Sequence, residues 1–295
     1  MAGAPEKDPI SGLYTTGHEW DGIAELNTPL PKWWVYVFYA TVIWSIGYWI
    51  VYPSFPVGKD FLPGIWEYSS RREVEADLVA AHAAHQKERS AIAAGSVDEI
   101  YANPPLRAYA IAGGGVLFKD NCAGCHQSGG AGAVGYPTLA DDEWIWGGTL
   151  ADIQQTLLHG IRYDRDPETR QSQMLAFGDI LSTDEIKQVA AYVKDMSNGK
   201  VVAGPGQKIY TENCAACHSS DGANPVSDGN PAMGAPPLGN RVWLYAGPGK
   251  EMTMERLQAQ ISKPKHGVMP AWSGRLKDED IKMLTVYVHS LGGGQ

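Results

Sequence analysis

The sequence predicts a mostly helical chain in which one membrane-spanning helix precedes two copies of a small helical domain. Three observations lead to this expectation: a long uncharged run near the N-terminus, two Cys-x-x-Cys-His strings, and an internal repeat built around those strings. At 295 residues the chain has room for two domains of about 100 residues each and an extension. Its overall hydrophobic content of 44% is ordinary for a globular protein, so the membrane signal is local.

The uncharged run predicts a transmembrane helix over residues 33–52. Lys32 and Lys59 are the nearest charges on either side, and a helix of this length spans roughly 30 Å, the thickness of the hydrocarbon core of a bilayer. The alternatives are a buried core helix and a secretory signal peptide, which would start closer to the N-terminus. Aromatic residues, which favour membrane–water interfaces, stand at both ends of the run: Trp33, Trp34, Tyr36, Tyr48, Trp49 and Tyr52.

All four cysteines lie in the Cys-x-x-Cys-His strings at residues 122–126 and 214–218. This spacing suits covalent haem attachment, because two thiols bond the vinyl groups and the histidine then lies under the iron. The alternatives are a redox dithiol and a zinc ribbon, but the cysteine pairs of a zinc ribbon are only about 15–20 residues apart. We therefore expect two covalently bound haem c groups. Their predicted attachment residues are Cys122, Cys125, Cys214 and Cys217, and their predicted histidine ligands are His126 and His218.

The two strings head copies of one pattern, and a duplicated domain explains why the register is kept over so many positions. In each copy we expect a helix around the leading aromatic residue to cross and pack on a closing helix around the last tyrosine. The matched positions are Phe118 with Tyr210, Pro137 with Pro236, Trp144 with Trp243, Trp146 with Tyr245, Met174 with Met269, and Tyr192 with Tyr287.

Met174 and Met269 are the predicted sixth ligands of the two irons. They are the only methionines at matching places in both copies, and methionine raises the potential of a haem that transfers electrons. We expect each methionine to serve its own copy, so that Met174 pairs with His126 and Met269 with His218.

Other residues compete for this role. Met196 and Met283 fall in the predicted closing helices, where packing in the core is the ordinary use of methionine. His159 and His266 each lie shortly before one of the matched methionines, and they remain rival ligands.

The surroundings of the haem are predicted from seven further residues. Proline has no N–H, so a turn at Pro137 or Pro236 leaves the carbonyl available to the other ring N–H of the ligating histidine; a simple turn proline is the alternative. The residues expected to wall the haem and bind its propionates are Trp144, Trp146, Trp243, Tyr245 and Arg241, although core packing accounts equally well for the four aromatic residues.

These signals divide the chain into five parts. Residues 1–32 precede the span at 33–52, residues 53–105 form a helical connector that ends at an Asn-Pro-Pro break, and residues 106–199 and 200–295 are the two copies. Positive charges lie on both sides of the span, so their count does not decide its orientation. Because bacteria attach haem c outside the cytoplasmic membrane, we expect a cytoplasmic N-terminus and periplasmic haem domains.

The segment before the span carries a family resemblance. The strings Asp21-Gly22-Ile23, Glu25-Leu26-Asn27 and Pro29-Leu30-Pro31-Lys32-Trp33-Trp34 precede one span, a spacer and two haem domains. This order resembles the dihaem subunit of cbb3-type cytochrome c oxidases, the CcoP or FixP family, over nearly the whole chain. The resemblance implies an all-α fold with one N-terminal transmembrane helix followed by two tandem class I cytochrome c domains.

The resemblance also implies a function and partners. Members of this family take electrons from a small soluble cytochrome c and pass them through a monohaem cytochrome c subunit to the haem–copper catalytic subunit, which reduces oxygen and pumps protons. The chain is thus expected to be an electron-transfer subunit of the bacterial inner membrane that is not catalytic alone. A net charge of −9 argues against nucleic acid and for a basic partner.

Two other functions compete with this one. The first is an independent, membrane-tethered dihaem carrier similar to cytochrome c4 that serves several oxidases. The second is a dihaem peroxidase, but that chemistry needs an open iron position and two matched methionines argue against it.

Overall fold

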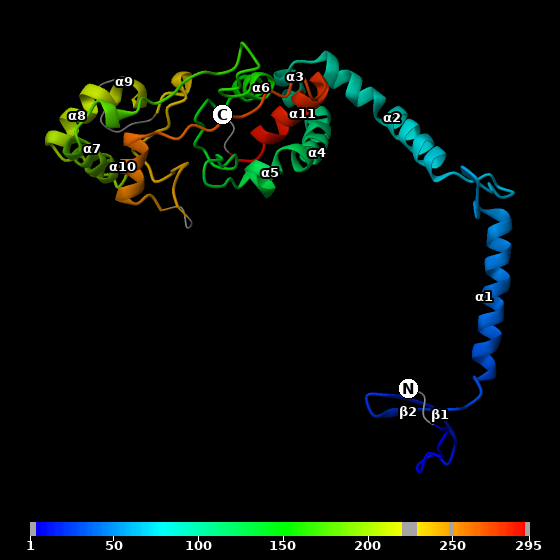
Figure 1. Ribbon diagram of the computed structural model, residues 1–295. Coiled ribbons are helices and arrows are strands. Elements are labelled where there is room, and N and C mark those ends of the chain that lie inside the picture. The colour runs from blue at the N-terminus through cyan, green and yellow to red at the C-terminus, as the bar shows by residue number, and fades with distance from the viewer. Residues whose placement is uncertain (1–3, 220–228, 248–250, 293–295) are drawn as a thin grey trace. The chain divides into compact units, whose positions relative to one another are not determined.

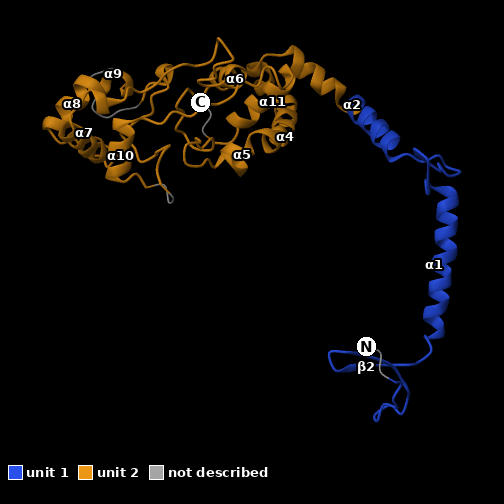
Figure 2. Ribbon diagram, viewed as in Figure 1, with its two compact units in different colours: residues 1–83 blue, residues 84–295 orange. Residues whose placement is uncertain are grey.

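The computed structural model describes residues 4–219, 229–247 and 251–292. The chain forms two compact units, residues 1–83 and 84–295 (Figure 2). Helices dominate the chain (Figure 1), in agreement with the predicted all-α fold.

The first unit begins with a β-hairpin that the sequence analysis did not predict. Strand β1 (Thr15–Trp20) pairs antiparallel with strand β2 (Ile23–Leu26). Asp21 and Gly22 form the turn with φ of 49° and 85°, and positive φ at both positions is the property for which Asp-Gly is selected in tight hairpins. A second small hairpin consists of β3 (Pro56–Val57) and β4 (Asp60–Phe61).

Helix α1 (Lys32–Val51) lies between these hairpins and covers the predicted span. None of its residues is buried against protein. A helix that is apolar all round and has no protein cover suits lipid, so the core helix of a soluble protein is rejected. The helix stops where Tyr52 becomes extended ahead of Pro53.

Helix α2 (Ser70–Ala94) is the solvated connector expected from its charged sequence, and its C-terminal end packs into the second unit. Ile92 there is fully buried. Arg89 Nη2 lies 3.2 Å from Glu279 and 2.9 Å from Asp280, both in the last helix of the chain. Helix α3 (Val97–Ala102) follows.

Helix α4 (Pro104–Asn121) begins immediately after α3. The side chain of Asn103 accepts the backbone N–H of Leu106 and caps α4. Pro104 and Pro105 occupy its first turn, where the missing N–H costs no hydrogen bond. The Asn-Pro-Pro break therefore starts a helix instead of a linker.

The rest of the second unit is short helices joined by turns. The helices are α5 (Ala123–His126), α6 (Leu150–His159), α7 (Thr183–Met196), α8 (Pro205–Asn213), α9 (Ala215–His218), α10 (Met254–Ser262) and α11 (Asp278–His289), with 3-10 turns η1 (Ser128–Gly130), η2 (Phe177–Asp179) and η3 (Pro231–Met233).

The two copies of the repeat exchange their closing helices. Helix α11 packs on α4 and α6, whereas α7 packs on α8 and α10 (Figure 1). The matched aromatic residues follow the same pattern: the ring centroid of Phe118 lies 5.3 Å from that of Tyr287, and Tyr210 lies 5.4 Å from Tyr192. The helices cross as predicted, but the expectation that they do so within one copy is wrong.

The connection between α7 and α8 explains the exchange. Only residues 197–204 join these helices, and a short connection favours packing of the two helices it joins. A Cβ at Gly206 of α8 would collide with the backbone of Gln188 and with Tyr192, so glycine lets the helices touch. The residues 106–199 and 200–295 are therefore copies in sequence, but neither is a self-contained packing unit.

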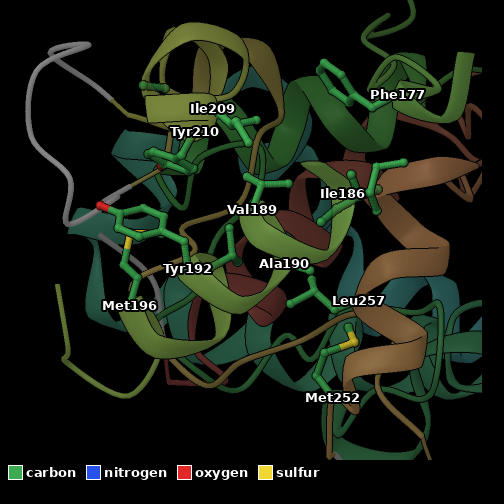
Figure 3. Packing of buried hydrophobic residues seen from close by; sticks show 13 residues of the cluster. Phe177, Ile186, Val189, Ala190, Tyr192, Met196, Ile209, Tyr210, Met252 and Leu257 are labelled. Carbon is green, nitrogen blue, oxygen red and sulfur yellow. The ribbon is translucent and has the colours of Figure 1, made fainter. Parts of the chain in front are cut away.

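Each exchanged half has its own hydrophobic cluster. In one half, Ile186 and Val189 of α7 pack with Tyr210 and Leu257 (Figure 3). In the other half, Phe118, Ile153, Leu157, Ile281, Leu284 and Val288 form the matching cluster. We call the half built from α7, α8 and α10 the His218 site, and the half built from α4, α6 and α11 the His126 site, after the histidine that each contains.

Candidate haem-binding site

Each Cys-x-x-Cys-His string forms one turn of helix at the end of a longer helix. Cys122 ends α4 and precedes α5, and Cys214 ends α8 and precedes α9. The backbone N–H of His126 donates to Cys122 O at 2.9 Å, and that of His218 to Cys214 O at 3.0 Å. Residues three and four apart share one side of a helix, so the two thiols and the imidazole of each string face the same way.

The thiols differ in exposure within each string. Cys122 is buried and Cys214 is half-buried, whereas Cys125 and Cys217 are exposed. Burial, with a smaller contribution from the neighbouring cysteine, raises the pKa of Cys122 to about 11 and that of Cys214 to about 12. A neutral thioether suits such positions better than a thiolate.

The two histidine rings are held by the prolines that the sequence analysis singled out. His126 Nδ1 lies 3.1 Å from Pro137 O, and His218 Nδ1 lies 2.9 Å from Pro236 O. A carbonyl only accepts, so Nδ1 carries the hydrogen and Nε2 has the lone pair that an iron ligand needs. Burial lowers the pKa of both imidazoles, which also favours the neutral ring.

A cavity of about 1010 Å³ borders both strings. Trp144, Trp243 and Arg241 line it, as do both thiols and the histidine of each string. The two donor sets of paired thiols and one oriented imidazole, beside a space of this size, fit haem c.

The two predicted methionine ligands lie in opposite halves from those expected. Met269 packs in the cluster of Phe118 and Cys122, and Met174 packs in the cluster that includes Cys214. Each methionine directly precedes a closing helix. It therefore lies in the same half as that helix and not in the half that contains the histidine of its own copy. The packing therefore groups Met269 with the His126 site and Met174 with the His218 site, which differs from the expected grouping within each copy.

The chain crosses between the sites just after α6. Ile161 and Met269 exchange backbone hydrogen bonds of 2.9 and 3.0 Å. Gly160, with φ of 69°, lies so close to this segment that a Cβ would collide with the backbone of Met269 and Pro270. Glycine at this position allows the first copy to hold the methionine segment of the second.

Two matched aromatic residues contact the opposite site reciprocally. Trp146 lies against Gly234 in the loop after the second string, and Tyr245 lies near Gly135 in the loop after the first. Both glycines have positive φ, 61° and 86°. The sequence predicts that both aromatics wall a haem, and both line the cavity. It does not predict their reciprocal contact, because that contact depends on the exchange.

The rival histidines are engaged elsewhere. His159 Nδ1 lies 3.3 Å from Asp166, and its Nε2 lies 3.3 Å from Glu168. His266 Nε2 accepts the backbone N–H of Met174 at 3.0 Å. These contacts favour the methionines over the histidines as iron ligands.

Arg162 is the cavity residue that the sequence analysis missed. Its guanidinium donates to two backbone carbonyls and lies over the ring of Trp146. No motif marks this residue, because the two carbonyls belong to segments that are far apart in sequence.

Comparison with known proteins adds the family. The N-terminal domain of cytochrome oxidase-cbb3, FixP, matches residues 12–59, cytochrome c matches residues 111–197, and subunit III of cbb3-type cytochrome C oxidase matches residues 202–288. The cbb3-type cytochrome c oxidase subunit FixP of Sinorhizobium medicae (strain WSM419) is 49% identical over 291 residues, which cover 98% of this chain and 97% of the relative. The chain belongs to the FixP/CcoP family. The predicted resemblance is confirmed.

Further FixP/CcoP members agree over the same length. The CcoP subunit of Azospirillum sp. (strain B510) is 48% identical over 297 residues, covering 98% of each chain. The FixP subunit of Bradyrhizobium diazoefficiens is 48% identical over 301 residues, covering both chains completely. The FixP N-terminal match contains hairpin β1–β2 and helix α1, and the cbb3-type subunit III match covers most of the second copy.

Proposed function

We propose that this chain is the membrane-anchored electron-transfer subunit of a cbb3-type cytochrome c oxidase and carries two covalent haem c groups. The observation that carries the proposal is the presence of two complete donor sets beside one cavity, in a chain that also has the FixP anchor segment. The cytochrome c matches cover both donor sets, and each contains two thiols and a histidine held through Nδ1.

The ligand assignment follows the exchanged packing. At one site Cys122 and Cys125 would attach the haem, and His126 and Met269 would hold its iron. The other site uses the matching set Cys214, Cys217, His218 and Met174. When bound, each haem supplies an iron that accepts and releases one electron.

Three features of this protein would set the reduction potential of that iron. The carbonyls of Pro137 and Pro236 orient the imidazoles. Thioether ligands favour ferrous over ferric iron relative to a second imidazole, so they raise the potential. Trp144 and Trp243 pack beside the sites and exclude water, which acts in the same direction because burial disfavours the more charged ferric state.

Membership of the family supports an orientation in the membrane and a set of partners. We place residues 1–32 in the cytoplasm, helix α1 in the inner membrane and the haem-binding unit in the periplasm. Residues 18–52 would hold the chain to the haem–copper subunit, and electrons from a soluble cytochrome c would pass on through a monohaem subunit. A net charge of −9 supports a basic donor surface.

The test is purification of the full chain in mild detergent. We expect it to co-purify with oxygen-consuming oxidase, and haem is expected to remain on the chain in a denaturing gel, with a mass increase of two haems. The matched control is Cys122→Ser with Cys125→Ser, which should retain one haem. A mass equal to that of the bare polypeptide would disprove haem attachment, and a dihaem chain that separates intact from every oxidase would favour the independent carrier.

A further inference from the structure

The side chain of Arg162 joins the two methionine segments. Its Nε donates to Gly267 O at 2.7 Å, and its Nη1 donates to Ser172 O at 3.0 Å. Gly267 is two residues before Met269, and Ser172 is two residues before Met174. One guanidinium therefore binds equivalent carbonyls in the two copies of the repeat.

The backbone of Arg162 is held in a conformation that arginine rarely adopts. Its φ is 52°, in the left-handed region. Its N–H donates to Arg170 O at 2.9 Å, and the preceding residue, Ile161, is paired with Met269. Backbone strain of this kind persists where the surrounding structure imposes it, and such positions cluster at functional sites.

The charge of Arg162 is held without a carboxylate. Among the ion pairs of the described residues, none includes Arg162. Its guanidinium donates to the two carbonyls and lies over the face of Trp146, 5.8 Å from the ring centroid, with Tyr245 and His266 close enough to feel its charge. The guanidinium keeps its proton in a protein. It is thus a fixed positive charge on the wall of the cavity that borders both histidine sites.

We propose that Arg162 is a positioning residue that holds both methionine segments at their sites and raises the potentials of both haems. The proposal rests on the proposed function, in which Met174 and Met269 are iron ligands. The forked guanidinium fixes two carbonyls at once, which a single-headed cation does not do. Its positive charge favours ferrous over ferric iron at both sites.

The test compares Arg162→Gln and Arg162→Lys in the full chain, using the sulfur-to-iron charge-transfer band of the oxidised protein and a redox titration. Arg162→Gln is expected to weaken the band of both haems and to lower the reduced-to-oxidised ratio of each about tenfold at a fixed potential, which is a shift of roughly 59 mV. Arg162→Lys keeps the charge but not the fork. It should weaken the band as much while lowering the potentials less.

Arg170→Gln is the matched control. Arg170 also lies 5.8 Å from the Trp146 ring centroid, but its side chain bonds Trp146 O, Asp152 and Gln155 and neither methionine segment. Arg170→Gln should leave the charge-transfer bands of both haems unchanged. Introducing Met174→His or Met269→His beside Arg162→Gln removes one band, so the remaining band reports on a single site.

The proposal would be overturned by a response at one haem only, by an equal response to Arg170→Gln, or by full retention of the bands in Arg162→Lys. The last result would mean that Arg162 acts only through its positive charge and not through its two hydrogen bonds. If Met174→His and Met269→His remove bands and Arg162→Gln does not, this inference fails while the proposed ligation stands. If neither methionine variant changes the spectrum, the ligation itself is wrong.

Discussion

Ile161 and Met269 are paired through both of their backbone hydrogen bonds, at 2.9 and 3.0 Å, although they belong to different copies of the repeat. The first copy thus holds the methionine segment of the second. The same exchange brings Met174 into the cluster of Cys214. Two sites that look separate in the sequence are consequently parts of one folded unit.

The first prediction is that each haem iron takes its histidine ligand from one copy of the repeat and its methionine ligand from the other. In a chain that carries haem only at Cys122 and Cys125, because Cys214→Ser and Cys217→Ser remove the other attachment, Met269→His should lower the potential of the remaining haem. A second imidazole favours ferric iron relative to a thioether, so the expected direction is downward. A redox titration with the charge-transfer band as a second readout measures it.

Met174→His in the same single-haem chain is the control and should leave the potential and the band unchanged. The opposite result, with a response to Met174→His and none to Met269→His, would restore ligation within each copy. Met283→Leu should cost packing stability without changing the spectrum, since Met283 is a buried core residue.

The contact between α4 and α11 gives the second prediction. A Cβ at Gly114 would meet the backbone carbonyl of Met283 and Cβ of Tyr287, whereas a Cβ at Gly113 would meet the flexible thioether of Met283. Gly114→Ala should therefore destabilise the second unit by about 1–3 kcal/mol through overpacking. Urea denaturation followed by circular dichroism provides the measurement.

Gly113→Ala is matched to it, because both changes add the same methyl group to the same helix. Alanine favours helix over glycine by about 1 kcal/mol, so Gly113→Ala should be neutral or mildly stabilising. Equal stabilities of the two alanine variants would show that α4 does not pack on α11 as described.

The third prediction concerns pH. The hydroxyl of Ser182 donates to the Glu185 carboxylate at 2.7 Å and the backbone N–H of Ser182 donates at 2.8 Å, and these bonds lower the pKa of Glu185 below its ordinary value of 4.5. A lowered carboxyl pKa stabilises the fold above the ordinary value, and this stabilisation is lost as pH falls through the folded value. Ser182→Ala should therefore be less stable than the parent at neutral pH.

The difference between Ser182→Ala and the parent should narrow below about pH 4.5 as Glu185 becomes protonated. Thermal melts over a pH series measure it. Ser290→Ala is the control, because its hydroxyl bonds Tyr287 O and no carboxylate. A stability difference for Ser182→Ala that does not vary with pH would remove Glu185 from the explanation.

The ion pairs of Arg89 give the fourth prediction. Arg89→Met should free the C-terminal end of α2 from α11 and cost about 1 kcal/mol or less, since the guanidinium is partly exposed. Amide hydrogen exchange should quicken over residues 86–94. The control is Lys187→Met, which removes an exposed ion pair with Asp184 on α7. It should change neither the free energy of unfolding nor the amide exchange of residues 86–94. Unchanged exchange in Arg89→Met would mean that burial of Ile92 and the hydrogen bond from Lys282 Nζ to Ala93 O, at 2.8 Å, hold the helix end without the ion pairs.

The sequence was sufficient to predict helix α1 and the four crossing helices, but not the hairpin β1–β2 or which of the four helices pack together. The uncharged run predicted α1, and the aligned Phe118, Tyr210, Tyr192 and Tyr287 predicted the four helices that cross. Periodicity shows which face of a helix is apolar, but it does not show which of two equivalent faces covers it. Both pairings satisfy the same pattern, and the length of the connection at 197–204 decides between them.

The candidate site was predictable to the same extent. The strings predicted the thiols and histidines, and the prolines predicted the ring contacts at Nδ1. The sequence did not point to Arg162 for two reasons. Its acceptors are main-chain carbonyls, which every residue type has, and the segments that contain them become neighbours only through the exchange.

The packing of α4 against the last helix of the chain has a consequence for biosynthesis. A ribosome completes Phe118 and its haem-attachment string early, whereas Tyr287 is made almost at the end. The face of α4 that packs on α11 therefore stays uncovered until nearly the whole polypeptide has been made. A haem attached early to Cys122 and Cys125 would spend that interval without the methionine segment that completes its site, and a chain interrupted after residue 199 would lack that segment.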